Sequence, residues 1–153
     1  MTEPTREVMI RDRLRQLLDS QLLAVLSTAG ATGPYASLIA FAATQDLSLL
    51  LFATPRTTRK FANLTAQPAV GLLVDNRTNQ GADFQAAQAA TILGQAREVD
   101  RAERPELERL YLAKHPHLEE FVRAPSTALI QVTVQSYYLV ERFQEVMELH
   151  VKP

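Results

Sequence analysis

The sequence predicts an α+β protein that is mainly β, with a small closed antiparallel sheet and helices confined to the connections. Three observations predict this class: about seven β-capable segments, Gly-rich or polar turns between several of them, and helical periodicity only at 5–19, 58–66 and 101–114. A sheet that closes on itself leaves no exposed edge. The 153 residues contain no repeat and no linker, so we expect a single domain over 1–153.

The first half of the chain predicts a surface helix followed by a hairpin. Residues 5–19 place apolar side chains among charged ones at roughly helical spacing, which indicates one buried stripe. The turn cluster at 29–34 contains Gly30, Gly33 and Pro34 and separates two β-capable runs, which is typical of a hairpin. The strands predicted in this half span 22–28, 35–43, 47–52 and 70–74, and a short helix spans 58–66.

The second half is harder to interpret around its alanine-rich stretch at 82–96. Alanine favours helix, whereas Thr91, Ile92 and Leu93 favour strand. We expect a helical turn at 82–87 and a strand at 88–98. A helix follows at 101–114, then a half-buried strand in which Ile130, Val132 and Val134 alternate with polar residues and which continues irregularly to 140, and a last strand at 143–151.

Composition excludes several classes of function. The net charge of −1 shows no bias toward nucleic acid, and the absence of cysteine removes thiolate nucleophiles and thiolate metal sites. His115 and His117 are two residues apart and would not share a helix face, so we expect no metal. No apolar run approaches the ~20 residues that span a bilayer, and the N-terminus has no signal-peptide core. We therefore expect a cytoplasmic protein without nucleic-acid or membrane partners.

The segment 54–60, Thr-Pro-Arg-Thr-Thr-Arg-Lys, is the most informative in the chain. It joins a predicted strand to a predicted helix whose first turn carries Arg59 and Lys60. The helix macrodipole disfavours cations at a helix start and favours anions there. Hydroxyls, free backbone N–H groups and cations together suit a phosphate. The alternative is a solvated basic helix end, because surface cations are common.

With Phe52 and Ala53 in front of it, this segment resembles the pyridoxamine 5'-phosphate oxidase-like family of FMN-binding split barrels. In that family a strand ends in aromatic-x-Thr and a Ser/Thr-Arg-Lys opens the following helix. The order of elements is similar over nearly the whole chain. The resemblance implies an antiparallel split β-barrel with peripheral helices, FMN as the cofactor, and a homodimer with FMN in the cleft between the subunits.

The resemblance also implies roles for particular residues. Arg59 and Lys60 would hold the FMN phosphate, with hydroxyl or backbone contacts from Thr54 and Thr58. The strand that contains Ser37, Leu38 and Ile39 would line the isoalloxazine ring through its backbone.

The polar loop at 75–80 admits two interpretations. It is either a simple polar turn, since turns favour these residues, or a segment that brings Arg77, flanked by Asn76, to the pyrimidine edge of the flavin. Reduction builds negative charge at that edge, and a cation placed there stabilises it.

The chain departs from the genuine oxidase in the region that binds the pyridoxal substrate. It contains no tryptophan, and 140–144 does not reproduce the family's arginine-containing signature. We therefore expect a flavoprotein that is an oxidoreductase, moving a hydride or electrons through flavin N5 to another small molecule. No general acid or base can be assigned. The alternatives are a non-catalytic FMN or haem carrier of the same fold, or a protein that prefers a deazaflavin.

Overall fold

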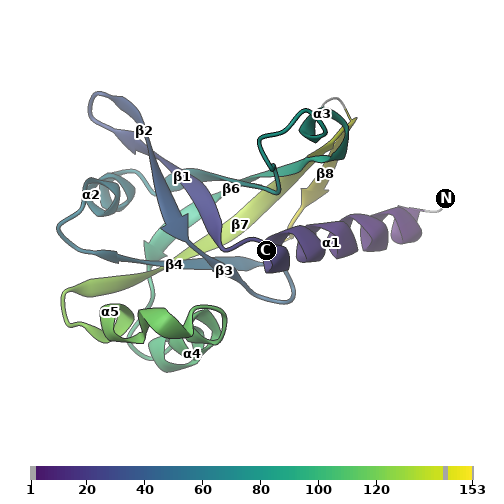
Figure 1. Ribbon diagram of the computed structural model, residues 1–153. Coiled ribbons are helices and arrows are strands. Elements are labelled where there is room, and N and C mark those ends of the chain that lie inside the picture. The colour runs from purple at the N-terminus through teal and green to yellow at the C-terminus, as the bar shows by residue number, and fades with distance from the viewer. Residues whose placement is uncertain (1–2, 143–144, 153) are drawn as a thin grey trace.

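The computed structural model describes residues 3–142 and 145–152, and within them the strands form one antiparallel sheet that curls into a half barrel (Figure 1). The strand order is β2-β1-β5-β6-β7-β4-β3, and β8 pairs with β7. Helices lie around this sheet, as predicted: α2 at one end, α4 and α5 below, and α1 beside β8. The predicted α+β class and the split barrel implied by the resemblance are confirmed.

The strands are β1 (Leu23–Gly30), β2 (Gly33–Ala40), β3 (Ala42–Ala43), β4 (Leu49–Pro55), β5 (Ala69–Asp75), β6 (Gln88–Glu98), β7 (Thr127–Glu141) and β8 (Glu145–His150). The helices are α1 (Glu3–Ser20), α2 (Arg59–Ala66), α3 (Asp83–Ala86), α4 (Arg104–Lys114), α5 (Glu119–Arg123) and the 3₁₀ turn η1 (Pro116–Leu118). No helix in the described ranges is both long and apolar enough to cross a membrane.

The sheet is split because the predicted strand at 35–43 breaks at Phe41. Its buried ring and an N–H bond to the Leu22 carbonyl (3.3 Å) turn the chain from β2 into β3, which pairs with β4. Thus β2 and β3 end the ladder, and the expectation of a closed sheet without an edge is wrong. Pro34 lies in β2, where its missing N–H is tolerated on an edge strand.

Alternating side chains build two apolar layers. From β4, Leu50 and Phe52 point into the curl of the sheet, where they meet Leu14 of α1. Leu51 points to the other face, where it packs beneath α4 and α5 with Leu129. The period-2 pattern of β4 therefore places α4 on the outside of the barrel, directly behind the strand that leads to α2.

Three boundaries differ from the sequence prediction. Leu47 lies in a turn with φ 65° rather than in a strand, because the Asp46 carboxylate accepts bonds from Thr44 Oγ1 (2.7 Å) and Ser48 N–H (3.0 Å). Hydrogen bonds from Ser48 and Thr44 lower the Asp46 pKa to about 2. Segment 116–123 forms η1 and α5, which the sequence did not predict. Of the strand predicted at 143–151, residues 143–144 lie outside the described ranges, and β8 covers 145–150.

Gly94 marks the one irregularity in the long β6–β7 ladder, where the register shifts between Leu93 and Gly94. A Cβ at residue 94 would lie 2.4 Å from the Thr133 carbonyl oxygen and 2.8 Å from a Val132 methyl. Only glycine allows the two strands this approach.

Gly94→Ala is expected to lower the free energy of unfolding by about 1–3 kcal/mol, because the added methyl forces two backbones apart. Denaturant unfolding of the full chain measures it. Gly81→Ala is the matched control, because a Cβ at residue 81 meets nothing within 4 Å. Equal stability of the two variants would contradict the close approach at β6–β7.

Candidate anion and cofactor site

The start of α2 is built by two threonines at the end of β4. Thr58 is the N-cap, and its Oγ1 accepts the N–H of Phe61 (3.3 Å). Its hydroxyl lies 2.7 Å from that of Thr54 and 3.1 Å from the Pro55 carbonyl oxygen. Thr54 is only 1% exposed, so it supports Thr58 from behind and presents no surface of its own.

Arg59 and Lys60 open α2 without a counter-charge. The first turn has no acidic residue, and neither side chain forms an ion pair within the described part of the chain. The Arg59 guanidinium lies 5.2 Å from the centre of the Tyr35 ring on β2, a cation–π contact that sequence reasoning missed. Two cations at the positive end of a helix dipole repel it and each other, so this site favours an anion.

Arg56, in the same segment, is already neutralised. Its guanidinium donates to the Glu98 carboxylate (2.6 Å) and to the Pro125 carbonyl (2.8 Å), and the hydrogen bond to Glu98 raises the pKa of Arg56. Within the described chain, the unpaired positive charge of this segment is therefore that of Arg59 and Lys60.

α2 is tied to the hairpin by a side-chain bond. Asn63 Nδ2 donates to Thr28 Oγ1 on β1 (3.0 Å), and Thr28 Oγ1 lies 3.4 Å from the carbonyl of Tyr35 on β2. The basic start of α2 is thus fixed relative to β2, the strand predicted to line a flavin.

The three predicted residues of β2 differ in what they present. Ser37 faces the side of β2 that carries Tyr35, and its buried Oγ has no hydrogen-bond partner in the described structure. Ile39 is buried in the core, whereas Leu38 is 65% exposed on the opposite face. The free edge of β2 is open for backbone contacts, as the sequence prediction requires.

The loop between β5 and β6 is ordered by its own hydrogen bonds. Asn76 Oδ1 accepts the Gln88 N–H (2.7 Å), and the Asp83 carboxylate accepts N–H bonds from Thr78 (2.9 Å) and Asn79 (2.6 Å). The hydrogen bonds to the Asp83 carboxylate lower its pKa, and the bond from the Thr78 backbone N–H has the largest effect. Asn76 therefore closes the base of the loop.

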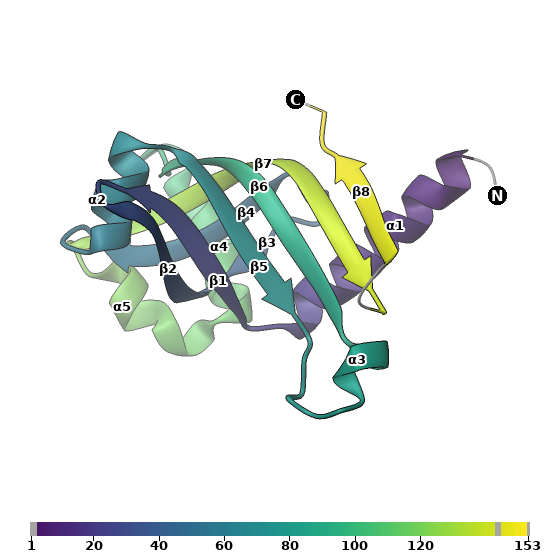
Figure 2. The ribbon, with the colours of Figure 1, turned by 90° about the horizontal axis from the view of Figure 1, so that it is seen from above.

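Arg77 lies at the rim of a hollow of about 450 Å³ on the outer sheet face, with its Nε 3.0 Å from the Asp75 carboxylate. Leu38 lines the same hollow. In both views α2 and α3 stand at opposite ends of the sheet (Figures 1 and 2). The structure brings Thr54, Thr58, Arg59 and Lys60 together, and Leu38 with Arg77, but it does not join these two groups within one chain.

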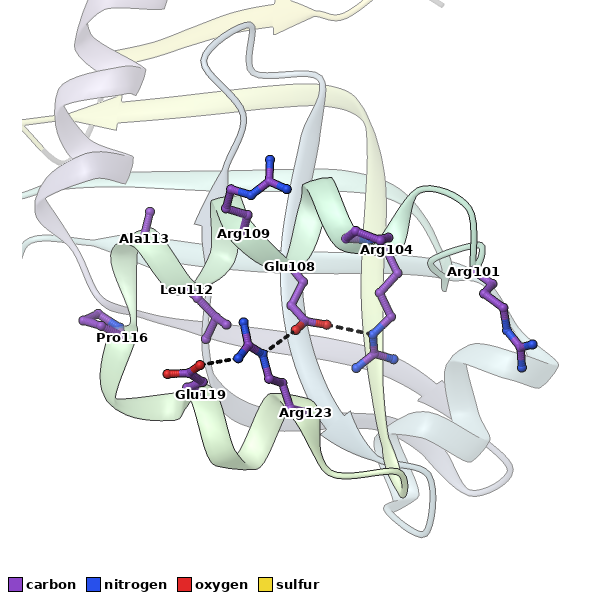
Figure 3. A pocket seen from close by; sticks show the side chains of 10 residues that line it. Arg101, Arg104, Glu108, Arg109, Leu112, Ala113, Pro116, Glu119 and Arg123 are labelled. Carbon is purple, nitrogen blue, oxygen red and sulfur yellow. Dashed lines mark hydrogen bonds and ion pairs between the residues drawn. The ribbon is translucent and has the colours of Figure 1, made fainter.

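A second arginine-rich region, between α4 and α5, provides a contrast. It is a hollow of about 730 Å³ (Figure 3). Glu108 bridges Arg104 and Arg123 at 3.1 Å each, and Arg123 also pairs with Glu119. Arg104 further donates to the carbonyls of Val122 and Thr127. These cations are neutralised by the protein itself, unlike those of α2.

The fold and the basic strand–turn–helix define the class of the protein: a split barrel with cations, unpaired in the described residues, where β4 passes into α2. A family model described as pyridoxamine 5'-phosphate oxidase matches residues 10–141. The chain belongs to this family. No curated protein sequence matches the chain.

Solved structures with low sequence identity share the fold. A putative pyridoxamine 5'-phosphate oxidase from Listeria innocua is 14% identical with a TM-score of 0.63, and covers 92% of this chain and 98% of its own. An FAD-binding protein from Mesorhizobium loti is 12% identical with a TM-score of 0.67, covering 83% and 89%. A haem binding protein from Mycobacterium smegmatis is 14% identical with a TM-score of 0.80; the match covers 92% of this chain but only 57% of that protein.

Thr58→Ala is expected to destabilise the protein by about 1–2 kcal/mol, because it removes the N-cap and the partner of the buried Thr54 hydroxyl. Urea unfolding measures the loss. The neighbouring exposed residue gives the control, Thr57→Ala, which should change stability by less than about 0.5 kcal/mol. If both variants lose equally, Thr58 does not cap α2 in solution.

Proposed function

We propose that the protein binds FMN as a homodimer and acts as a flavin-dependent oxidoreductase on a small molecule. The observation that carries this proposal is the pair of cations at the start of α2, which has no counter-charge in the described chain. A terminal phosphate is dianionic at neutral pH and accepts several hydrogen bonds, which suits two cations, a capping hydroxyl and free N–H groups.

The residues present fit the cofactor beyond its phosphate. Ser37 has a buried hydroxyl without a partner two residues along the same face of β2 as Tyr35, which contacts Arg59. A buried polar group without a partner is costly, so a polar ligand atom at this position would satisfy it. The flavin ring would lie along the edge of β2 at Ser37–Ile39, with its phosphate at Arg59 and Lys60.

When bound, FMN supplies hydride or electron transfer at N5. The chain supplies binding and orientation: Arg59 and Lys60 neutralise the phosphate, and Thr58, supported by Thr54, orients the first turn of α2. Arg77 would place positive charge at the pyrimidine edge, and Asn76 would hold the loop that carries it. The flavin would carry the redox step, so the residues named here act in binding and orientation.

The structural neighbours include an FAD-binding protein and a haem binding protein. These names support a planar redox cofactor but do not distinguish flavin from haem. The α2 site favours FMN. FMN ends in a monophosphate, whereas haem carries carboxylates and needs an axial ligand. His115 is 1% exposed with its Nε2 bonded to a backbone carbonyl, which leaves it poorly placed for that role.

The Arg59→Ala/Lys60→Ala variant is expected to bind FMN at least about 100-fold more weakly, because two charge-assisted contacts of about 1.5–3 kcal/mol each are lost. Titration of the apoprotein with FMN, followed by flavin fluorescence, measures the affinity. Riboflavin, which lacks the phosphate, should bind equally weakly to the wild type and the variant.

The matched control is Arg101→Ala/Arg109→Ala, which removes two exposed cations from the α4 region and makes the same change in net charge. It should leave FMN affinity unchanged. Wild-type protein that binds no FMN would overturn the proposal, and haem uptake instead would favour the carrier alternative. Bound flavin that no reductant reduces at a useful rate would support binding but not oxidoreductase activity.

The outer face of the sheet supports the homodimer. Register places Leu38, Leu73 and Leu93 on the same face, and all three are exposed. Leu23 and Val146 extend this apolar surface at its ends. A contiguous apolar surface on a sheet is typical of an interface. A second copy packed here would lie against the Leu38–Arg77 hollow, which forms part of the proposed site.

Leu93→Glu is expected to convert the dimer, about 34 kDa as twice the 17.1 kDa chain, into a monomer, because a charge on each copy would be buried at the interface. Light scattering after size exclusion measures the mass. Phe121→Glu, at an exposed apolar position on α5, is the control and should stay dimeric. A wild-type monomer that binds FMN would contradict the shared site.

A further inference from the structure

Three polar side chains near the end of α4 reach back to the point where β2 ends. The Tyr111 hydroxyl donates to the Ala40 carbonyl (2.9 Å), and His115 Nε2 donates to the Phe41 carbonyl (2.7 Å). Lys114 Nζ donates to the Leu18 carbonyl at the end of α1 (2.9 Å) and lies 3.9 Å from the centre of the Phe41 ring. We call Tyr111, Lys114 and His115 the α4 clamp.

The three side chains of the clamp are wholly or partly removed from water, so the geometry of their hydrogen bonds affects stability. Tyr111 and His115 are buried and Lys114 is half-buried. Burial raises the Tyr111 pKa to about 12 and lowers the pKa of His115. Polar groups removed from water are costly unless their partners are correctly placed. The clamp is therefore stable only when the carbonyls at 18, 40 and 41 are held where these side chains meet them.

The clamp acts on a strand at the edge of the sheet. β2 is an edge strand with β1 as its ladder partner, and Ala40 directly follows Ser37–Ile39. Leu107, Leu110 and Tyr111 of the same helix pack in the layer that contains Leu51 of β4. α4 thus contacts both sides of the split, the β2 end by hydrogen bonds and β4 by apolar packing.

We propose that Tyr111, Lys114 and His115 are positioning residues for the flavin: they fix the backbone of β2 at Ser37–Ile39 and so raise the affinity of the protein for FMN. This inference rests on the proposed FMN site. Holding an edge strand in its binding conformation before the ligand arrives removes an ordering cost from binding. None of the three needs to touch the cofactor.

The test uses full-length Tyr111→Phe, which removes one hydroxyl and keeps the ring, and Lys114→Met, which removes the charge and keeps the stem. Each is expected to weaken FMN binding about fivefold or more, the equivalent of one hydrogen bond. Lys114→Arg retains a cation and should recover part of the loss. The control is Arg109→Met, which removes an exposed cation from the same helix; in Figure 3 its side chain points away from Glu108 and Arg123.

Hydrogen exchange of the FMN-free proteins provides a second readout. The amides of 38–41 should exchange faster in Tyr111→Phe and Lys114→Met than in the wild type or Arg109→Met, while those of central β6 stay protected. If these residues had a purely structural role, exchange would rise uniformly in the variants, and their folded fraction would bind FMN as tightly as the wild type. That result would overturn the inference. A wild type without FMN affinity would overturn both proposals, and the exchange data would still report whether the clamp holds β2.

A pH series checks that Lys114 lies where the clamp requires. The Lys114 ammonium faces Asp19 of α1 and the Phe41 ring. Tyr111, His115 and His117 lie near it on α4 and the segment that follows. Burial lowers its pKa to about 8 against the opposing effect of Asp19. Between about pH 8 and the ordinary lysine pKa of about 10.4 the unfolded chain binds more protons, so the stability of the wild type should rise with pH relative to Lys114→Met. A flat difference would place Lys114 in solvent and overturn its part in the clamp.

Discussion

Uncompensated positive charge at the start of α2 is the constraint on which the proposed site depends. The same chain neutralises several of its other arginines: Arg56 meets Glu98, and Arg104 and Arg123 share Glu108. Arg59 and Lys60 are placed instead where the helix dipole is already positive. Exposure to water reduces the cost of this arrangement but does not remove it. An anion at this position would turn an unfavourable cluster into several charge-assisted contacts.

The split in the barrel determines what lies beside that charge. Because β3 rather than β2 pairs with β4, β2 keeps a free edge next to the helix that β4 leads into. Asn63 and Thr28 hold α2 to the hairpin at one end of β2, and α4 holds the other end through Ala40 and Phe41. The edge strand is thus restrained at both ends while its middle stays accessible. A rigid but open edge suits backbone recognition of a planar ligand.

Sequence reasoning located the features that are determined locally. The short helix at 58–66, the cations in its first turn and the hairpin across 29–34 are each encoded within about ten residues, so periodicity and turn chemistry predict them. The contacts of Tyr111 with Ala40 and of His115 with Phe41, at the bend in the strand, join positions about 70 residues apart, and no local pattern encodes them. His115 follows the end of α4, and it is buried with its Nε2 bonded to the Phe41 carbonyl. The single domain over 1–153 and the cytoplasmic location stay predictions.

The separation of Arg77 from Arg59 links cofactor binding to assembly. If one flavin is to contact both, the two side chains must come from different copies, since α2 and the loop before β6 lie at opposite ends of one sheet (Figure 2). The apolar face that would join two copies adjoins the hollow formed by Leu38 and Arg77. A ligand that binds the dimer and not the monomer stabilises the dimer by mass action. FMN affinity and subunit affinity would then rise and fall together. A substitution at the cofactor site would change dimer stability, and one at the subunit interface would change FMN affinity.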